Sequence, residues 1–299
     1  MPRADTQKAD LILCGDLHIG NWQPECRSDV YLDALLNKIR WMAALQITHG
    51  CPLVFPGDVF NTWKADSELL NKVMAVWPKG DVLAVCGQHD LRNHNLELQD
   101  QSAFDTLRLA GMLQDVSQEA KELPKGIVVY GASWGREAKA APNCAHPVLV
   151  AHVTLWEKPF APGQKPGEAT RYLKENKDWQ LICTGDNHQT FTAIDGISEL
   201  VNAGSVMRMR SDQKDFRPCV FLWNADIGNI RQLFIPISPD VISDARCKAA
   251  KEREARENEF VARLESDADI SFSFNDHIDK ALITETEEVR ECVLECTGR

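Results

Sequence analysis

Five short groups of side chains that could bind metal ions stand in the sequence, each with aspartate, histidine or an amide. They are Asp16-Leu17-His18, Gly57-Asp58, Gly87-Gln88-His89-Asp90, Ala151-His152 and Gly185-Asp186-Asn187-His188. Any one group alone is typical of a turn or a helix cap. Together, carboxylate, imidazole and amide donors suit Mn²⁺, Fe²⁺ or Zn²⁺ better than Ca²⁺. Six or seven donors exceed what one ion can hold, so the sequence predicts two metal ions.

Each of these groups follows a predicted strand. Apolar runs at 9–15, 51–55 and 81–86 predict three buried strands. Helical spacing of apolar residues between and after them predicts helices from Asp29, as N-cap, to about 42, at 66–76 and at 101–109. This βαβαβ order indicates a parallel sheet, in which the carboxyl ends of the strands meet at one edge. The first three groups are therefore expected side by side.

The remaining sequence predicts a mainly β second part. Short apolar runs stand at 126–134, 147–153, 180–185, 191–194, 199–204, 219–223 and 231–235, separated by turn residues. The run APGQKPG within 157–178 predicts a mobile surface loop. Its cationic residues could close over a substrate; they are Lys158, Lys165, Arg171, Lys174 and Lys177.

Composition narrows the classes of function. The 299 residues carry a net charge of −11 and a pI of about 5.2, which argues against a protein that coats nucleic acid. Ten cysteines without a CxxC pair, a polar start and no apolar run of membrane-spanning length predict a soluble cytoplasmic protein. We predict a catalytic domain over 1–239 and an acidic, helical extension over 240–299. That extension, with helices at about 240–266 and 277–296, is a candidate partner-binding or capping element.

The ordered groups resemble the signature of the calcineurin-like metallophosphoesterase family, which reads DxH, GD, GNH(D/E), H and GHxH. The resemblance covers residues 9 to about 235. It implies an α/β fold of four layers, in which two facing β-sheets are flanked by helices. It also implies a binuclear metal site that activates water for attack on a phosphoester.

Carried over by position, the resemblance gives each residue a role. The first metal would be held by Asp16, His18, Asp58 and His188, and the second by Asp58, Gln88, His152 and Asp186. His89, oriented by Asp90, would be the catalytic histidine, although Asp90 could instead be only a helix cap. Gln88 replaces the usual asparagine and Asp186 the usual first histidine. These changes make the second site harder and more anionic, which favours Mn²⁺, with Mg²⁺, Fe²⁺ and Zn²⁺ as alternatives.

A second resemblance concerns the substrate. The segment 201–208, VNAGSVMR, is similar to the (N/Q)PGS segment of SbcD-type DNA nucleases of bacteria and phages, with alanine in place of proline. It implies a 3′→5′ exonuclease with some endonuclease activity on single strands, in a bacterial or phage-infected cell. It also implies an SMC-like ATPase partner of SbcC type and a homodimer. His94, Arg208 and Arg210 are candidate DNA contacts, the arginines within a basic patch that could equally be a solvated hairpin.

Other interpretations stay open. The same metal site would serve a phosphodiesterase or phosphatase that acts on small nucleotides or phosphoproteins. A non-catalytic scaffold on the same fold is disfavoured because a scaffold has no physical need for six retained ligand and catalytic side chains. Trp22 and Trp63 could stack on a base near the metals, but their position beside strand ends favours a place in the core.

Overall fold

The computed structural model describes residues 8–161, 163–238, 241–243, 245–246, 248–249, 252–253, 255–256 and 287. Contacts divide the chain into units Met1–Arg246 and Cys247–Arg299. Val241 and Ile242, which follow the predicted limit at 239, are buried within the first unit, and Ile242 pairs with Arg27. Most of the predicted extension lies outside the described residues, as does the helix expected at 277–296 apart from residue 287; the residues described between 245 and 256 are helical.

The first sheet has the strand order β12-β11-β1-β2-β3-β4. As predicted, β1 (Leu11–Leu13), β2 (Leu53–Phe55) and β3 (Val82–Ala84) run parallel. β4 (Gln114–Asp115) extends this parallel set, whereas β11 (Cys219–Asn224) and β12 (Asn229–Phe234) are antiparallel additions beside β1.

The second sheet has the order β5-β6-β7-β8-β10-β9. Its inner strands are mutually parallel; they are β6 (Ile127–Ala132), β7 (His146–Ala151), β8 (Leu181–Thr184) and β10 (Ser198–Asn202). The edge strands β5 (Lys121–Leu123) and β9 (Phe191–Asp195) are antiparallel. β4 and β5 were not predicted, because two or three residues are too few to show a period.

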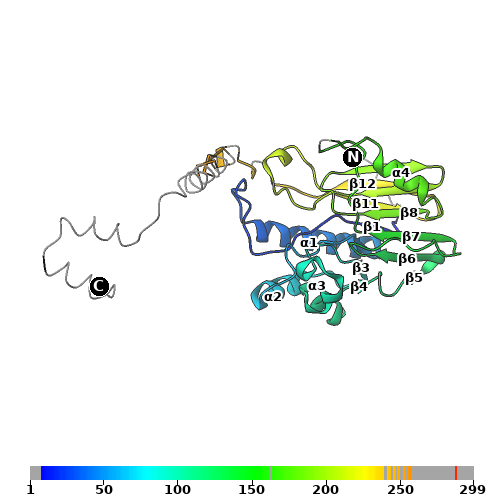
Figure 1. Cartoon of the computed structure of the whole chain (residues 1–299). Coiled ribbons are helices and arrows are strands. Elements are labelled where there is room, and N and C mark those ends of the chain that lie inside the picture. The colour runs from blue at the N-terminus through cyan, green and yellow to red at the C-terminus, as the bar shows by residue number, and fades with distance from the viewer. Residues whose placement is uncertain are drawn as a thin grey trace, which may run out of the picture. The chain divides into compact units, whose positions relative to one another are not determined.

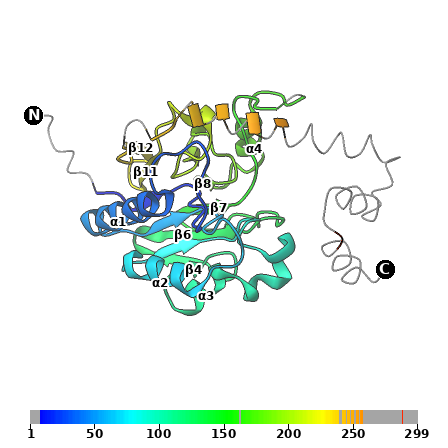
Figure 2. The ribbon, with the colours of Figure 1, turned by 90° about the vertical axis from the view of Figure 1, so that its left-hand side faces the viewer.

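Strand alternation divides the core into layers. Leu11 and Leu13 pack against the second sheet, while Ile12 between them faces helices. In the same way Val148 and Val150 of β7 face the first sheet, and Leu149 faces α4. Figures 1 and 2 show α1, α2 and α3 on one side of the paired sheets and α4 on the other. The expected architecture, two facing sheets flanked by helices, is confirmed.

The three helices predicted in the first part of the chain begin at or near the predicted positions. α1 spans Tyr31–His49, α2 Ser67–Val76, α3 Ala103–Leu109 and α4 Glu168–Glu175, and 3₁₀ turns cover Arg92–His94, Leu96–Gln101, Pro124–Gly126 and Ser211–Gln213. Asp66 caps α2 through the Leu69 N–H. The predicted cap of α1 is wrong: Val30 is its N-cap, and the Asp29 carboxylate binds the Arg27 guanidinium instead.

The segment predicted as a mobile loop, 157–178, contains α4. Ala169 and Leu173 anchor this helix in the second sheet's outer core, and its other residues are polar or partly exposed. This short helix was not predicted because the turn residues of APGQKPG stand directly before it.

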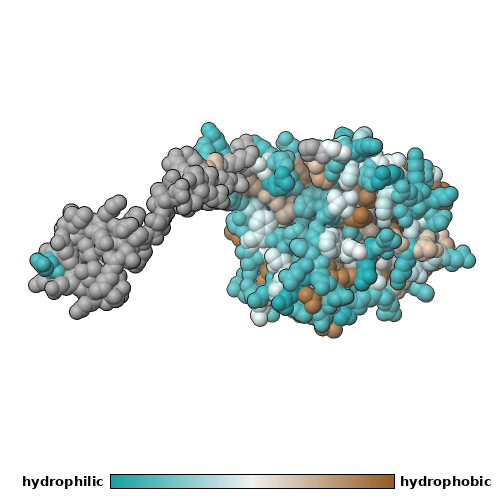
Figure 3. Space-filling model, in the orientation of Figure 1, coloured by the Kyte–Doolittle hydropathy of each residue, from teal (hydrophilic) through white to brown (hydrophobic). Residues whose placement is uncertain are grey.

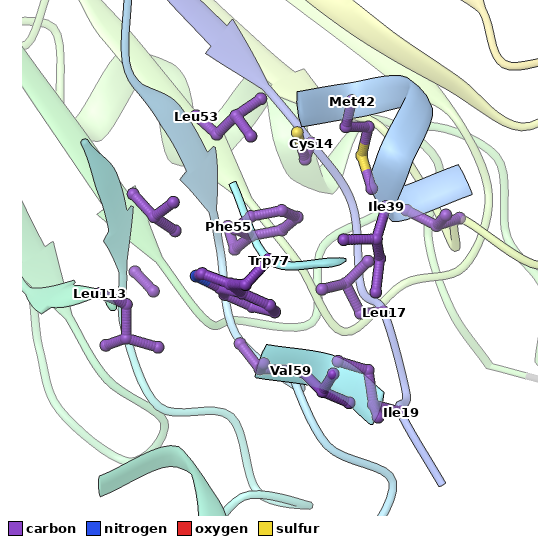
Figure 4. Packing of buried hydrophobic residues seen from close by; sticks show 14 of the residues in the cluster. Cys14, Leu17, Ile19, Ile39, Met42, Leu53, Phe55, Val59, Trp77 and Leu113 are labelled. Atoms are coloured by element: carbon purple, nitrogen blue, oxygen red, sulfur yellow. The ribbon is translucent and has the colours of Figure 1, made fainter. Parts of the chain in front are cut away.

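The layer under α1 and α2 is closely packed. Figure 4 shows Phe55 of β2 beside Trp77, whose ring centroids lie 6.1 Å apart, with Ile39 and Met42 of α1 nearby. The surface in Figure 3 is mostly hydrophilic, with small scattered hydrophobic areas on the visible face. Among the described residues, no helix has the length and apolar character needed to cross a membrane.

Candidate metal centre

The structure brings every predicted metal-ligand residue to one place. Asp16 and His18 follow β1, Asp58 follows β2 and Gln88 follows β3, all in the first sheet. The second sheet supplies three more, His152 after β7 and Asp186 and His188 after β8. Because both sheets present the carboxyl ends of parallel strands at this edge, their connecting loops converge there.

One group of candidate ligands consists of Asp16, His18 and His188. The Nε2 atoms of His18 and His188 lie 2.9 Å apart, and Nε2 of His188 lies 3.8 Å from Oδ2 of Asp16. One ligand atom from each residue falls within 4.8 Å of the others. Two imidazoles and a carboxylate at this spacing can hold one transition-metal ion.

A second group consists of Asp58, His152 and Asp186. Nε2 of His152 lies 3.5 Å from Oδ2 of Asp58 and 4.0 Å from Oδ1 of Asp186. The Gln88 amide lies between these side chains: its Oε1 is 2.7 Å from His152 Nε2, and its Nε2 donates to Asp186 Oδ1 at 2.5 Å. The two predicted replacements, Gln88 and Asp186, therefore meet in the second group.

Asp58 joins the two groups. Its Oδ2 lies 3.9 Å from Nε2 of His18 as well as 3.5 Å from that of His152. The other oxygen, Oδ1, accepts the backbone N–H of His89 at 2.9 Å. Asp58 is therefore the carboxylate that both groups could share.

Unpaired buried atoms show that the site fits metal ions. Asp16 Oδ1, His18 Nδ1 and Asp58 Oδ2 are buried and have no hydrogen-bond partner among the described residues. Buried polar atoms nearly always have partners, and unpaired carboxylate oxygens are costly in a protein interior. A cation bound between these side chains would supply the missing interaction to the two carboxylates.

The titration of the cluster agrees with this fit for the two histidines of the first group. Burial lowers the pKa of His18 to about 3 and also lowers the pKa of His188, so both imidazoles are neutral near pH 7, the form that binds metal. In the second group, burial acts against the charge of His152, but its contact with Asp58 outweighs this and raises the His152 pKa to about 9, so a metal ion there would have to displace a proton. Burial raises the pKa of Asp58, but the contact of Asp58 with His152 lowers it by more. The Asp58 pKa is therefore lowered to about 2. Burial raises the pKa of Asp16 well above its ordinary value.

Thr154 is a residue of this site that the sequence did not reveal. Its hydroxyl donates to Oδ2 of Asp186, the oxygen not used by Gln88. Asp186 is thus fixed by two side-chain donors. A threonine two residues after a histidine carries no recognisable signal, because only the folded β7 and β8 loops bring it to Asp186.

Backbone strain is concentrated at the candidate ligands. His18, Asp58 and Asp186 have φ angles of 49°, 45° and 73°, in the left-handed region that side chains rarely adopt. Such conformations persist only where the surroundings hold them, and they cluster at functional sites.

Gly57 allows His152 to approach the loop after β2. Gly57 has φ of 124°, and a Cβ there would lie 2.1 Å from Nδ1 of His152. We expect Gly57→Ala to displace that ring from the Pro56 carbonyl, lowering Tm by several degrees and weakening Mn²⁺ binding at least tenfold. Differential scanning fluorimetry and calorimetric Mn²⁺ titration measure these effects.

Gly50→Ala is the matched control. Gly50 also has positive φ, 68°, but a Cβ there meets nothing within 4 Å. This variant should lose about 1 kcal/mol from backbone strain and keep its Mn²⁺ affinity. If both variants bound Mn²⁺ as the wild type does, His152 would not be a ligand.

His89 lies at the candidate metal site as predicted, but Asp90 does not have the role predicted for it. His89 lies beside the cluster, its ring centroid 5.0 Å from that of His18. Asp90 does not orient its ring: Nδ1 of His89 lies 2.9 Å from the Asn61 carbonyl oxygen. The Asp90 carboxylate instead accepts the backbone N–H groups of Val59, Phe60 and Gly87, because the loop after β2 lies directly against it. Burial, followed by repulsion from Asp58, raises the pKa of Asp90 to about 7.

A cleft of about 610 Å³ adjoins the candidate ligands. Asp186, His188, Phe160 and Arg210 are among the residues that line it. Arg210 is largely exposed and pairs with Asp212 at 3.2 Å.

The other predicted substrate contacts lie elsewhere or face solvent. Arg208 is buried, and its guanidinium donates to the carbonyl oxygens of Lys214 and Ser238, so the predicted basic patch is not a single exposed surface. His94 is exposed, with φ of 53° and Nδ1 3.0 Å from the Gln88 carbonyl oxygen. Trp22 packs on Tyr31, and Arg92 lies over the Trp63 ring.

Metal binding should change the stability of the protein. A ligand that binds only the folded chain stabilises it by about 2.7 kcal/mol at a hundredfold excess over its dissociation constant. We therefore expect EDTA to lower Tm by a few degrees and excess Mn²⁺ to restore it, measured by scanning fluorimetry. Asp16→Asn should reduce the increase in Tm that Mn²⁺ causes. An identical Tm in EDTA and Mn²⁺ would contradict metal binding.

No protein-family model matches the chain, and no curated protein matches it. Several solved structures match it over most of its length, at low identity and low TM-score. A protein of Thermus thermophilus matches with a TM-score of 0.45 and 10% identity, over 77% of this chain and 100% of its own. An archaeal phosphodiesterase matches with a TM-score of 0.41 and 8% identity, over 75% and 98%. A metallophosphoesterase from Sphaerobacter thermophilus matches with a TM-score of 0.41 and 13% identity, over 82% and 95%. The chemistry assigned to this chain rests on its own site.

Proposed function

We propose that this chain is a metal-dependent phosphoester hydrolase whose substrate is DNA, cleaved at single strands or ends. The observation that carries the proposal is the pair of ligand groups joined by Asp58, with unpaired buried carboxylate oxygens and a histidine beside them. Two divalent ions held there would activate water and offset the charge of a phosphoryl group.

The chain's own residues would supply the rest of the mechanism. The Asn61 carbonyl fixes Nδ1 of His89, which leaves Nε2 as the ring nitrogen that can exchange a proton. Protonated at Nε2, His89 would donate that proton to the leaving oxygen of the phosphoester. Asp90 would have a positioning role: its hydrogen bonds to three backbone N–H groups hold the loops of Asp58 and His89 together.

The cleft beside the ligand groups supports a nucleic-acid substrate. Arg210 presents an exposed cation at the cleft, and Phe160 presents an aromatic ring that is about half exposed. A guanidinium suits a backbone phosphate, and an exposed ring suits stacking on an unpaired base. The 3′→5′ polarity, an SbcC-type ATPase partner and a homodimer are further parts of the proposal that stand on the sequence resemblance alone.

A substrate comparison tests the proposal. The full-length protein is incubated with Mn²⁺ and, in separate reactions, with DNA labelled at either end, a generic bis-phosphodiester and a phosphomonoester. Release of labelled nucleotides from DNA is the expected result, and the two labels report polarity. Turnover of the small esters without DNA cleavage would make the chain a small-nucleotide phosphodiesterase or phosphatase. Inactivity on all three substrates would contradict a hydrolase.

A further inference from the structure

A second pocket, of about 340 Å³, shares no lining residue with the candidate metal centre or its cleft. It lies between the start of α1 and the segments that follow β10 and β12. Three cationic side chains line it: Arg27 before α1, Lys38 on α1, and Arg208 after β10. All three are buried.

The cations of this pocket are held mainly by neutral groups. Lys38 donates from Nζ to the Val206 carbonyl oxygen at 2.6 Å, and Arg27 donates from Nη1 to that of Arg208 at 2.8 Å. The Arg208 guanidinium likewise binds two backbone carbonyls. Carbonyl dipoles fix the positions of these groups without cancelling their charge.

Among the described residues that line the pocket, Asp29 carries the one negative charge. It is bound to Arg27 through both carboxylate oxygens, at 2.9 and 2.6 Å. The charges of Lys38 and Arg208 therefore lack a partner of opposite sign in this lining. Buried charges are normally paired because an uncompensated charge in a protein interior is costly.

Lys38 shows the effect of this crowding. Burial, followed by repulsion from Arg27 and Arg208, lowers the pKa of its ammonium group to about 7. An anion in the pocket would reverse this repulsion and favour the charged form.

We propose that this pocket is a binding site for a dianionic oxyanion, the phosphate group of a small ligand, held by Lys38, Arg27 and Arg208. Guanidinium and ammonium groups are the side chains that best bind phosphate, through charge-assisted hydrogen bonds. Asn37 offers a neutral polar group and Trp41 an apolar wall, so the volume admits a phosphate with an organic substituent as well as free phosphate.

The test is calorimetric titration of the full-length chain with sulfate, inorganic phosphate and AMP, both Mn²⁺-loaded and after chelation. Binding in both states is expected, because the pocket needs no metal. Lys38→Met keeps the length of the side chain and removes its charge, and should weaken sulfate binding at least tenfold. The same variant should raise Tm without ligand, because it removes a buried repulsion, and should abolish the increase in Tm that sulfate causes.

Lys72→Met is the matched control. Lys72 is an exposed lysine on α2 that pairs with Glu68, and this variant should bind sulfate as the wild type does. Affinity for AMP well above that for phosphate would identify a nucleotide as the ligand, and equal affinities would identify free phosphate. No binding by the wild type, or equal binding by wild type and Lys38→Met, would overturn the proposal. None of these measurements is a cleavage assay. A negative result here would therefore leave the proposed hydrolase function standing, and failure of the hydrolase function would leave the phosphate site standing.

The pH dependence gives a second readout. The charged or titratable groups here are Arg27, Asp29 and Cys26 before α1, Lys38 on α1 and Arg208 after β10, with Arg246 bound to the Arg27 carbonyl. Arginines stay protonated, and sulfate itself does not titrate in this range. As pH rises from 6 to 8, Lys38 loses its proton, so sulfate affinity should fall in the wild type and stay flat in Lys38→Met. A flat wild-type profile would also contradict the role of Lys38.

Discussion

Asp58→Asn is expected to lower kcat/KM by roughly a thousandfold or more and to reduce bound Mn²⁺ from two ions per chain to one or none. The substitution keeps the size of the side chain but removes the charge that both ligand groups share, at 3.9 Å from His18 and 3.5 Å from His152. Activity on the substrate that the wild type cleaves and metal analysis of the desalted protein measure the two effects.

Asp178→Asn provides the control for Asp58→Asn. Asp178 is exposed and is not one of the candidate ligands, so this variant should retain both ions and full activity. Asp58→Asn should lose some stability, because its contact with His152 stabilises the ionised Asp58 carboxylate, and an unchanged circular dichroism spectrum would confirm that the variant is folded. Retention of two ions and of activity by Asp58→Asn would show that the two groups do not share this carboxylate.

His89→Gln is expected to lower kcat by roughly a hundred- to a thousandfold, the range for loss of a general acid. Because His89 is predicted to be catalytic and not a ligand, KM and the Mn²⁺ content should stay near the wild-type values. Steady-state kinetics and metal analysis distinguish the two roles.

Metal analysis of His89→Gln is needed because the structure also allows His89 to be a metal ligand. His18, Asp58 and His89 also offer one ligand atom each within 4.8 Å of one another, so the ring of His89 stands where it could bind metal. Loss of an ion in His89→Gln would make His89 a ligand. His146→Gln, at the start of β7 and bound to Gln180, is the histidine control and should change neither kcat nor metal content.

The sequence predicts which candidate ligands come together because their placement depends on local rules. Each ligand group follows an apolar strand, often with an intervening glycine, and parallel strands bring such positions to one edge. The conformations of Asp58 and Asp186, at positive φ directly after glycine, belong to the same tight loops. The sequence pattern alone therefore predicts that these groups gather at one edge, without knowledge of contacts between distant residues.

The roles of Asp90, Thr154 and Arg208 could not be predicted in this way. Asp90 binds N–H groups of a loop about thirty residues away, and Thr154 reaches Asp186 of a neighbouring strand's loop. Arg208 looks like a surface cation in a charged stretch, but the segment near Ser238 covers it. In each case the partner is set by tertiary packing, which leaves no periodic trace in the sequence.

The contact between His18 and His188 joins positions 170 residues apart, one after a strand of each sheet. Closing so long a loop costs conformational entropy, and contacts between residues close in sequence do not offset this cost. The ligand cluster is therefore expected to form only once the two sheets have docked. We accordingly expect the candidate metal centre to form late in folding, with affinity for Mn²⁺ appearing together with the native interface between the sheets. An ion bound there would act as a cross-link between the two sheets, at the edge of the hydrophobic layer that packs them together.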